Sequence, residues 1–151
     1  MQTTKADVLT QIRAAFPTHP IQAAGAFDER GTSYLDPVAY REHLEGKTWE
    51  QLDREYLERR TDALSFLGTN HLIAVLPAYL CIFVEQGTRT QVPDTLLLVL
   101  NRKKRRFEEL SSALTPAQRE AIVAALGVFA ATESGQPADT ARTAAERWKA
   151  C

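Results

Sequence analysis

The chain has 151 residues, of which 44% are hydrophobic, 25% charged and 8% aromatic, and its formal net charge is −1. This composition is typical of a soluble globular domain and excludes a disordered, collagen-like or disulfide-scaffold chain. One domain is expected at this length. A net charge close to zero removes the strongest argument for non-specific binding to nucleic acid or to an anionic membrane.

Cysteine usage and the apolar segments point to a cytoplasmic protein. Cys81 lies in an apolar run and Cys151 is the last residue, so the two form no disulfide framework and fit a reducing compartment. The N-terminal segment MQTTKADVLT lacks the apolar core of a secretory signal. The longest apolar run, residues 72–84, is shorter than the about twenty residues that span a membrane.

Helical periodicity is the dominant pattern, beginning near the N-terminus. Val8, Ile12 and Phe16 fall at helix spacing, and Pro17 ends that helix. Residues 17–35 carry prolines and glycines with little periodicity and predict a long loop. Loops of that length in compact domains are often functional or mobile.

Two helix starts follow the loop. Asp36-Pro37 predicts a short helix ending near Gly46, with the aspartate as its cap and proline in its first turn. The sequence Thr48-Trp49-Glu50-Gln51 matches a capping box. It predicts a single helix from Thr48 to about Leu67.

The second half of the chain predicts further helices. The segment from His71 to Gln86 is helical but broken or restarted at Pro77, since proline removes a helix hydrogen bond. The next helices are expected at Pro93–Leu100 and Arg102–Ser112, followed by a mostly apolar helix from Thr115-Pro116 to about Ala131. A helix that is apolar on most sides lies centrally in a domain.

These patterns predict an all-α fold, a single compact domain of about seven helices. Residues 1–131 are expected to form the helical core. Residues 132–151 are expected to form a linker, Ser134–Pro137, and a C-terminal helix with a weak apolar stripe that packs on the core or extends from it. No alternation is long enough to predict a strand.

Motifs for catalysis and cofactor binding are missing from the sequence. The glycines form no dinucleotide or phosphate loop, and no serine stands in a G-x-S-x-G elbow. His19, His43 and His71 have no partner at metal-ligand spacing. His71 and Cys81 would lie roughly 15 Å apart on a continuous helix, too far for a base–nucleophile pair. We therefore expect no cofactor, no metal and no enzymatic activity, with Cys81 an inert buried thiol.

Asp53, Tyr56 and Arg60 fall on the apolar face of the helix expected after Thr48. Two charges on a buried face are costly unless they are paired or hydrogen-bonded. One interpretation is a structural network in which the three side chains satisfy one another or loop carbonyls. The others are a polar pocket for a small ligand or a partner's side chain, and an enzyme site centred on the trio.

The opposite face of the same expected helix is acidic. Residues 36–62 contain eight acidic and five basic residues, a local charge of −3. Such a face is either solvated or complementary to a basic partner. The candidate partner-binding residues are the acids Glu50, Glu55, Glu58 and Asp62, with Phe27 and Tyr34 of the long loop as anchors.

Five consecutive cations, Arg102 to Arg106, form the sharpest charge feature. On a helix they cannot share one face, and Glu108 and Glu109 can pair with Lys104 and Arg105 at i,i+4. A phosphate site would use Lys103, Lys104, Arg105 and Arg106 and would bind in a strongly salt-dependent way. The aromatic residues that usually stack on bases are not interleaved. A solvated helix end and a protein-binding site are the alternatives, and nucleic acid is not the expected partner.

Two short segments carry a resemblance to a known group of proteins. They are the Leu76-Pro77-Ala78-Tyr79-Leu80 step and the sequence Leu114-Thr115-Pro116-Ala117-Gln118 that opens an apolar helix. In these segments the chain resembles short helical bacterial proteins of unknown function, which are similar to immunity proteins of interbacterial toxin systems in size, cytoplasmic character and lack of catalytic motifs. The resemblance covers roughly residues 5–131 and transfers no catalytic residue.

The leading hypothesis is a non-enzymatic protein-binding module, an immunity protein that neutralises a cognate toxin or effector domain by direct binding. Charged surface would steer the encounter, and a few anchors would set the residence time. A nucleic-acid-associated regulator using residues 102–106 is one alternative. A small-ligand-binding protein or enzyme centred on Asp53, Tyr56 and Arg60 is the other.

Overall fold

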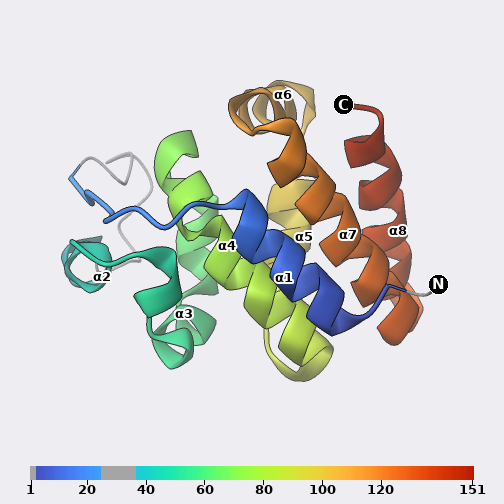
Figure 1. Cartoon of the computed structure of the whole chain (residues 1–151), viewed down its shortest axis with the longest axis horizontal. Helices are drawn as coiled ribbons and strands as arrows, with labels where there is room; N and C mark the ends of the chain where they lie inside the picture. Colours follow the sequence, from blue (N-terminus) through green and yellow to red (C-terminus); the bar gives the residue numbers. More distant parts are fainter. Residues whose placement is uncertain (1–2, 25–36) are drawn as a thin grey trace.

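The computed structural model describes residues 3–24 and 37–151, and over these residues the chain forms one compact all-α domain, which confirms the predicted fold class (Figure 1). Short 3-10 helices join several of the α-helices: η1 (Trp49–Gln51), η2 (Thr61–Ser65) and η3 (Gly87–Arg89). The α-helices of the described residues are α1 (Lys5–Ala15), α2 (Pro37–Leu44), α3 (Arg54–Arg59), α4 (Thr69–Gln86), α5 (Val92–Leu100), α6 (Lys104–Ala113), α7 (Pro116–Thr132) and α8 (Gly135–Lys149).

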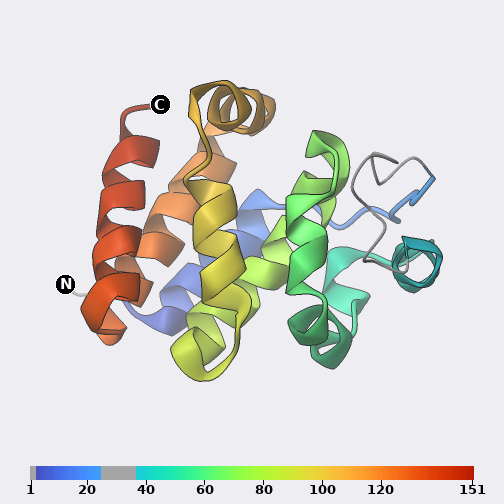
Figure 2. The ribbon, with the colours of Figure 1, turned by 180° about the vertical axis from the view of Figure 1, so that it is seen from behind.

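The α4 helix runs through the middle of the domain. In Figure 1, α1 crosses in front of α4, and Figure 2 shows α5 on the opposite side. Every residue from Val75 to Val84 is buried. By length and composition α4 could cross a membrane, but 67% of its apolar window is buried inside the domain. Such all-round burial is typical of the core helix of a folded domain.

Pro77 lies inside α4, and the break predicted there is wrong, because the helix continues from Thr69 to Gln86. A proline in a helix interior is unfavourable by about 3 kcal/mol. Residues 75–84 of α4 are all buried, and full burial of one large apolar side chain contributes about 1.5–3 kcal/mol, so a few of them offset that penalty. One helix hydrogen bond is missing, because Pro77 has no N–H to donate to the carbonyl of Ile73.

The single helix predicted from Thr48 to Leu67 is also wrong, because the segment forms three short elements. The Gln51 side chain accepts the Thr48 N–H at 2.9 Å, as in the predicted capping box, but η1 ends after one turn. Asp53 then caps α3, its carboxylate accepting the N–H of Glu55 at 3.0 Å. Each interruption changes the helix register, so the apolar and acidic faces predicted for one continuous helix do not form.

The other predicted helices agree with the structure apart from their ends. α6 begins at Lys104, so Arg102 and Lys103 precede it, and α8 begins at Gly135, so the predicted linker is largely helical. Of the predicted loop at 17–35, the described part, residues 17–24, contains the buried residues Ile21 and Ala23. The expected cap Asp36 lies outside the described residues.

The C-terminal helix packs along α7 (Figure 2). Side chains near its end hold the segment that links α5 to α6. Trp148 is buried, and its indole nitrogen donates to the carbonyl of Leu100 at 2.8 Å. The Arg147 guanidinium donates to the carbonyl of Arg102 and lies 3.8 Å from the ring centre of Phe107. α8 is therefore built into the same hydrophobic core as the rest of the domain.

Candidate functional site

A cavity of about 330 Å³ opens where the end of α1, the first half of α4 and the start of α7 meet. Its walls are mostly apolar and include Phe16, Ile21, Trp49, Ile73 and Pro77. Concave, mainly apolar sites with a few polar groups are the usual places where proteins bind ligands and partner side chains. This cavity is our candidate functional site.

The loop of residues 16–24 forms one wall of this cavity and is fixed by hydrogen bonds. The His71 imidazole donates from Nε2 to the carbonyl of Gln22 at 2.8 Å, and the Trp49 indole donates to the carbonyl of Phe16 at 3.1 Å. The Ile21 N–H donates to the carbonyl of Lys47 at 2.9 Å. The wall is therefore formed before anything binds, which reduces the ordering penalty of binding.

Two polar groups at the cavity have hydrogen-bonding capacity to spare. Gln118 is 8% exposed, and its side-chain oxygen accepts the N–H of Thr115 at 2.9 Å. With its oxygen engaged in this cap, the Gln118 amide keeps two N–H donors that have no partner among the described residues. The second group is the Ile73 carbonyl, which Pro77 deprives of its helix donor. The cavity thus offers one donor group and one acceptor.

A smaller polar pocket of about 190 Å³ lies on the other side of Trp49 and is lined by Arg13, Glu50, Arg54 and Cys81, among others. Burial raises the pKa of the Cys81 thiol to about 11, and the neighbouring Arg54 offsets only part of that effect. At neutral pH the thiol is protonated, and a protonated thiol is a poor nucleophile. This pocket is therefore lined by charged side chains and by a thiol that is unreactive at neutral pH.

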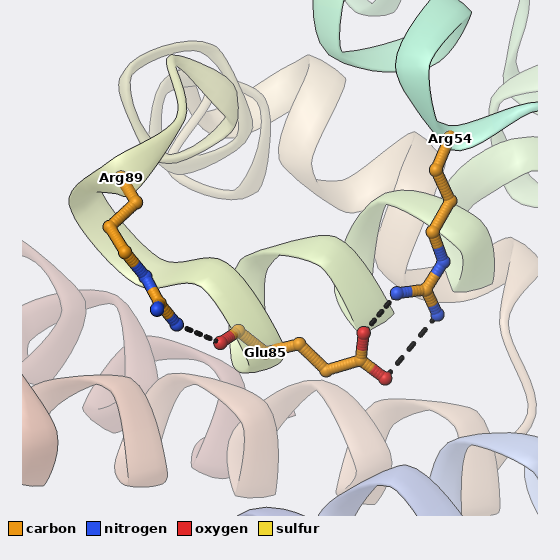
Figure 3. Close-up of polar contacts among 3 residues, drawn as sticks. All are labelled: Arg54, Glu85 and Arg89. Carbon is orange, nitrogen blue, oxygen red and sulfur yellow. Dashed lines mark hydrogen bonds and ion pairs between the residues drawn. The ribbon is translucent and has the colours of Figure 1, made fainter.

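Arg54 is held by an ion pair rather than left free for a ligand (Figure 3). Both of its terminal nitrogens contact the carboxylate of Glu85, one in a close ion pair and the other at 3.3 Å. Arg89 donates to the backbone carbonyl of Glu85 at 2.8 Å (Figure 3) and so satisfies a carbonyl at the end of α4. These contacts join α3 to the last turn of α4.

Asp53, Tyr56 and Arg60 do not form the network or pocket predicted for them. Asp53 is exposed and caps α3, and Arg60 contributes its backbone carbonyl, which accepts the Tyr79 hydroxyl at 3.0 Å. The Tyr56 ring stacks on His43 with 3.6 Å between ring centres, and its hydroxyl is buried with no partner among the described residues. The prediction failed because it assumed one continuous helix.

The predicted acidic face is distributed over three elements. Glu50 lies in η1, Glu55 and Glu58 in α3, and Asp62 in η2, so they do not share one helix face. Glu58 is partly buried and the other three are exposed. None of the four forms an ion pair with another described residue. The predicted anchors Phe27 and Tyr34 lie outside the described residues.

The basic cluster divides at the start of α6. Arg102 is half-buried and donates to the carbonyl of Leu64 at 3.2 Å, and burial together with repulsion from Arg106 lowers the pKa of its guanidinium. The exposed cations are Lys103, Lys104, Arg105 and Arg106, and Arg105 pairs with Glu109 at 3.5 Å. The predicted pair of Lys104 with Glu108 does not form. Cations at the start of a helix oppose its dipole, so these charges do not stabilise α6.

A model described as a family of unknown function, DUF6714, matches residues 4–150. The chain belongs to this family. The match includes α8, whereas the resemblance stated from the sequence covers roughly residues 5–131. No curated protein and no solved structure matches the chain. In this DUF6714 protein, no group of three or more His, Cys, Asp or Glu among residues 3–24 and 37–151 could hold a metal ion.

The cavity of this DUF6714 protein was not predicted from its sequence, although two of its groups carried a signal. The Thr115–Gln118 capping box fixes the Gln118 oxygen and leaves its amide nitrogen free. The lack of an N–H at Pro77, which predicts a break in α4, is also what leaves the Ile73 carbonyl without its helix donor. The meeting of α1, α4 and α7 is a tertiary arrangement that no local pattern encodes.

Proposed function

We propose that this DUF6714 protein is a non-enzymatic binding protein that recognises another protein, in the manner of an immunity protein that neutralises a toxin or effector domain. The observation that carries the proposal is the preformed apolar cavity between α1, α4 and α7. Protein interfaces owe most of their binding energy to a few anchor side chains seated in well-packed pockets.

The acidic residues add a second element of a protein interface. Glu50 directly follows the cavity residue Trp49, and Glu55, Glu58 and Asp62 follow in the next two elements. Because these carboxylates have no ion-pair partner among the described residues, a basic partner gains favourable interactions with them. Charges of this kind raise association rates and select partners more than they add affinity.

The reactive side chains near the cavity support binding rather than catalysis. The His71 imidazole is used to hold the carbonyl of Gln22, and the Cys81 thiol is buried with a raised pKa. A site for nucleophilic catalysis would need a nucleophile and a base within reach of each other. The toxin-neutralising role comes from the resemblance to immunity proteins, and the proposed cytoplasmic location rests on the cysteine usage.

The test is capture of the partner with matched charge variants. Tagged protein is incubated with lysate of the source organism at low salt, and the retained species are identified by native mass spectrometry. We expect a stoichiometric protein partner that is lost or weakened by the triple variant Glu50→Lys, Glu55→Lys, Glu58→Lys. The control variant makes the same charge change elsewhere, with Glu108→Lys, Glu120→Lys and Glu146→Lys. Retention of a small molecule alone, or of no partner, contradicts the proposal.

A second candidate function uses the exposed cations Lys103 to Arg106. The observation in its favour is that these exposed charges oppose the α6 dipole, and only Arg105 forms an ion pair among the described residues. A nucleic-acid regulator would bind DNA or RNA with an affinity that falls steeply with salt and is lost when all four cations become alanine. Absence of salt-sensitive retention on DNA and RNA excludes it.

A further inference from the structure

The cavity has a hydrogen-bonding pattern that indicates what it takes. The Ile73 carbonyl lacks its helix donor because residue 77 is proline, and residues four apart lie on the same face of a helix. Ile73, Ala74 and Pro77 all line the cavity, so this carbonyl lies on the cavity side of α4.

A hydrogen-bond donor at the cavity comes from α7. The Gln118 side-chain oxygen caps the helix through Thr115, which leaves its amide nitrogen as a donor at the same cavity. One free acceptor and one free donor beside apolar walls match a secondary amide that carries an apolar group. In proteins that chemical unit is a peptide group with its side chain.

We propose that the cavity binds a peptide group of the partner protein together with one apolar side chain. The partner's N–H donates to the Ile73 carbonyl, and its C=O accepts from the Gln118 amide. The side chain inserts between Phe16, Trp49 and Pro77. This inference deepens the proposed function and rests on it.

The size of the cavity agrees with this ligand. Ligand pockets span roughly 300–1,000 Å³. The cavity of about 330 Å³ is at the small end of that range and accommodates one side chain with its adjoining peptide group. Recognition of an exposed segment by such a pocket needs no change in the fixed wall formed by residues 16–24.

The test uses two probes of the same shape. N-(3-methylbutyl)acetamide carries the amide N–H, and 3-methylbutyl acetate replaces that N–H by an ester oxygen. Both are titrated into the full ¹⁵N-labelled chain and followed by two-dimensional NMR. The indole signals serve as paired reporters, since Trp49 lines the cavity while Trp148 lies at the far end of α8.

We expect saturable shifts of the Trp49 indole and of the Gln118 side-chain amide, with no shift at Trp148. The ester should bind about threefold to tenfold more weakly than the amide, since it lacks one hydrogen bond. Equal binding of the two probes, or no saturable shift at Trp49, overturns the inference.

Three variants and one control separate the contributions. Pro77→Ala restores the N–H that engages the Ile73 carbonyl, so it should abolish the difference between the probes while the melting temperature holds or rises. Gln118→Glu keeps the capping oxygen but removes the donors, so it should weaken both probes equally, by about threefold to tenfold. Ala74→Leu fills the cavity and should prevent binding of both probes. Ala124→Leu, in a separate groove on α7, should leave binding unchanged.

The same variants distinguish this inference from the proposed function. If a partner protein is captured, and the acidic triple variant loses it while Ala74→Leu retains it fully, the partner binds elsewhere and the inference fails alone. If the probes bind as expected but no protein is captured, the proposed function fails while the amide specificity of the cavity stands.

Discussion

The Trp148 indole donates a hydrogen bond to the carbonyl of Leu100 at 2.8 Å, joining α8 to the last residue of α5. The carbonyls at the end of a helix have no partner within the helix, so this bond satisfies a group that would otherwise be buried alone. The Trp148 ring also packs edge-on against Phe107 at 4.8 Å between ring centres. One side chain thus ties together α5, α6 and α8.

Replacing Trp148 by phenylalanine should lower the free energy of unfolding by about 1–3 kcal/mol, because the Leu100 carbonyl loses its donor while an aromatic ring is kept. The measurement is urea unfolding followed by circular dichroism. Lys149→Ala, one residue further on and exposed, is the control and should change stability by less than about 0.5 kcal/mol. Equal effects of the two variants would mean that the indole bond contributes nothing.

Gly87 connects α4 to η3 at a position that only glycine fits. Its φ is +54°, and a Cβ at this residue would overlap the carboxylate of Glu133, which accepts the Thr88 hydroxyl at 3.0 Å. Gly87→Ala should therefore destabilise the domain by about 1–3 kcal/mol through backbone strain and loss of the Glu133 contacts. Gly46→Ala is the control, because its φ is +75° but nothing lies within 4 Å of its Cβ. Thermal unfolding should give the larger loss for Gly87→Ala.

Tyr56 and Tyr79 should respond in opposite ways to loss of the hydroxyl. The Tyr56 hydroxyl is buried without a partner among the described residues, so Tyr56→Phe should leave stability unchanged or raise it by up to about 1 kcal/mol. The Tyr79 hydroxyl donates to the Arg60 carbonyl and accepts from Tyr40 at 3.2 Å. Tyr79→Phe should therefore lower the free energy of unfolding by about 1–3 kcal/mol. Chemical unfolding of the two variants compares them. A clear loss in Tyr56→Phe would reveal a partner for that hydroxyl.

The buried Cys81 thiol makes stability depend on alkaline pH. Because its pKa is raised to about 11 in the folded state, the contribution is fully present below the unfolded value near 9 and is lost as pH rises toward 11. The free energy of unfolding falls by about 2–3 kcal/mol in total over this pH range through Cys81. The pKa of Tyr79 is also raised by burial and acts in the same direction.

Urea unfolding at pH 7, 9 and 10.5 should give falling stability, with a shallower decline in Cys81→Ala. A thiol reagent provides an independent check at pH 8. Exposed Cys151 should react in the native protein and Cys81 only on unfolding, which the Cys151→Ser variant isolates. Rapid modification of Cys81 in that folded variant would contradict the assignment of a protonated, sealed thiol.

Helix starts could be predicted from sequence because their signals are local. The Thr115-Pro116 cap fixes the start of α7 within three residues of chain, and α2 begins at Pro37 as predicted. The prediction of one helix from Thr48 to Leu67 was wrong because it also relied on a local signal. An apolar pattern of helix period does not reveal the break at Asp53. The break predicted at Pro77 is wrong for a different reason, because the burial that accompanies the continuation of α4 through Pro77 is a property of the whole core.

The packing of α1 carries a consequence for how the domain assembles. An isolated helix of α1's length is marginal in water, so α1 depends on contacts to persist. Val8 and Ile12 are fully buried, and the neighbours of α1 are α4 and α7, about 60 and 110 residues further along the chain. Closing loops of that length is entropically unfavourable until the partner helices have formed. We therefore expect α1 to dock late in folding, onto a surface assembled by the second half of the sequence.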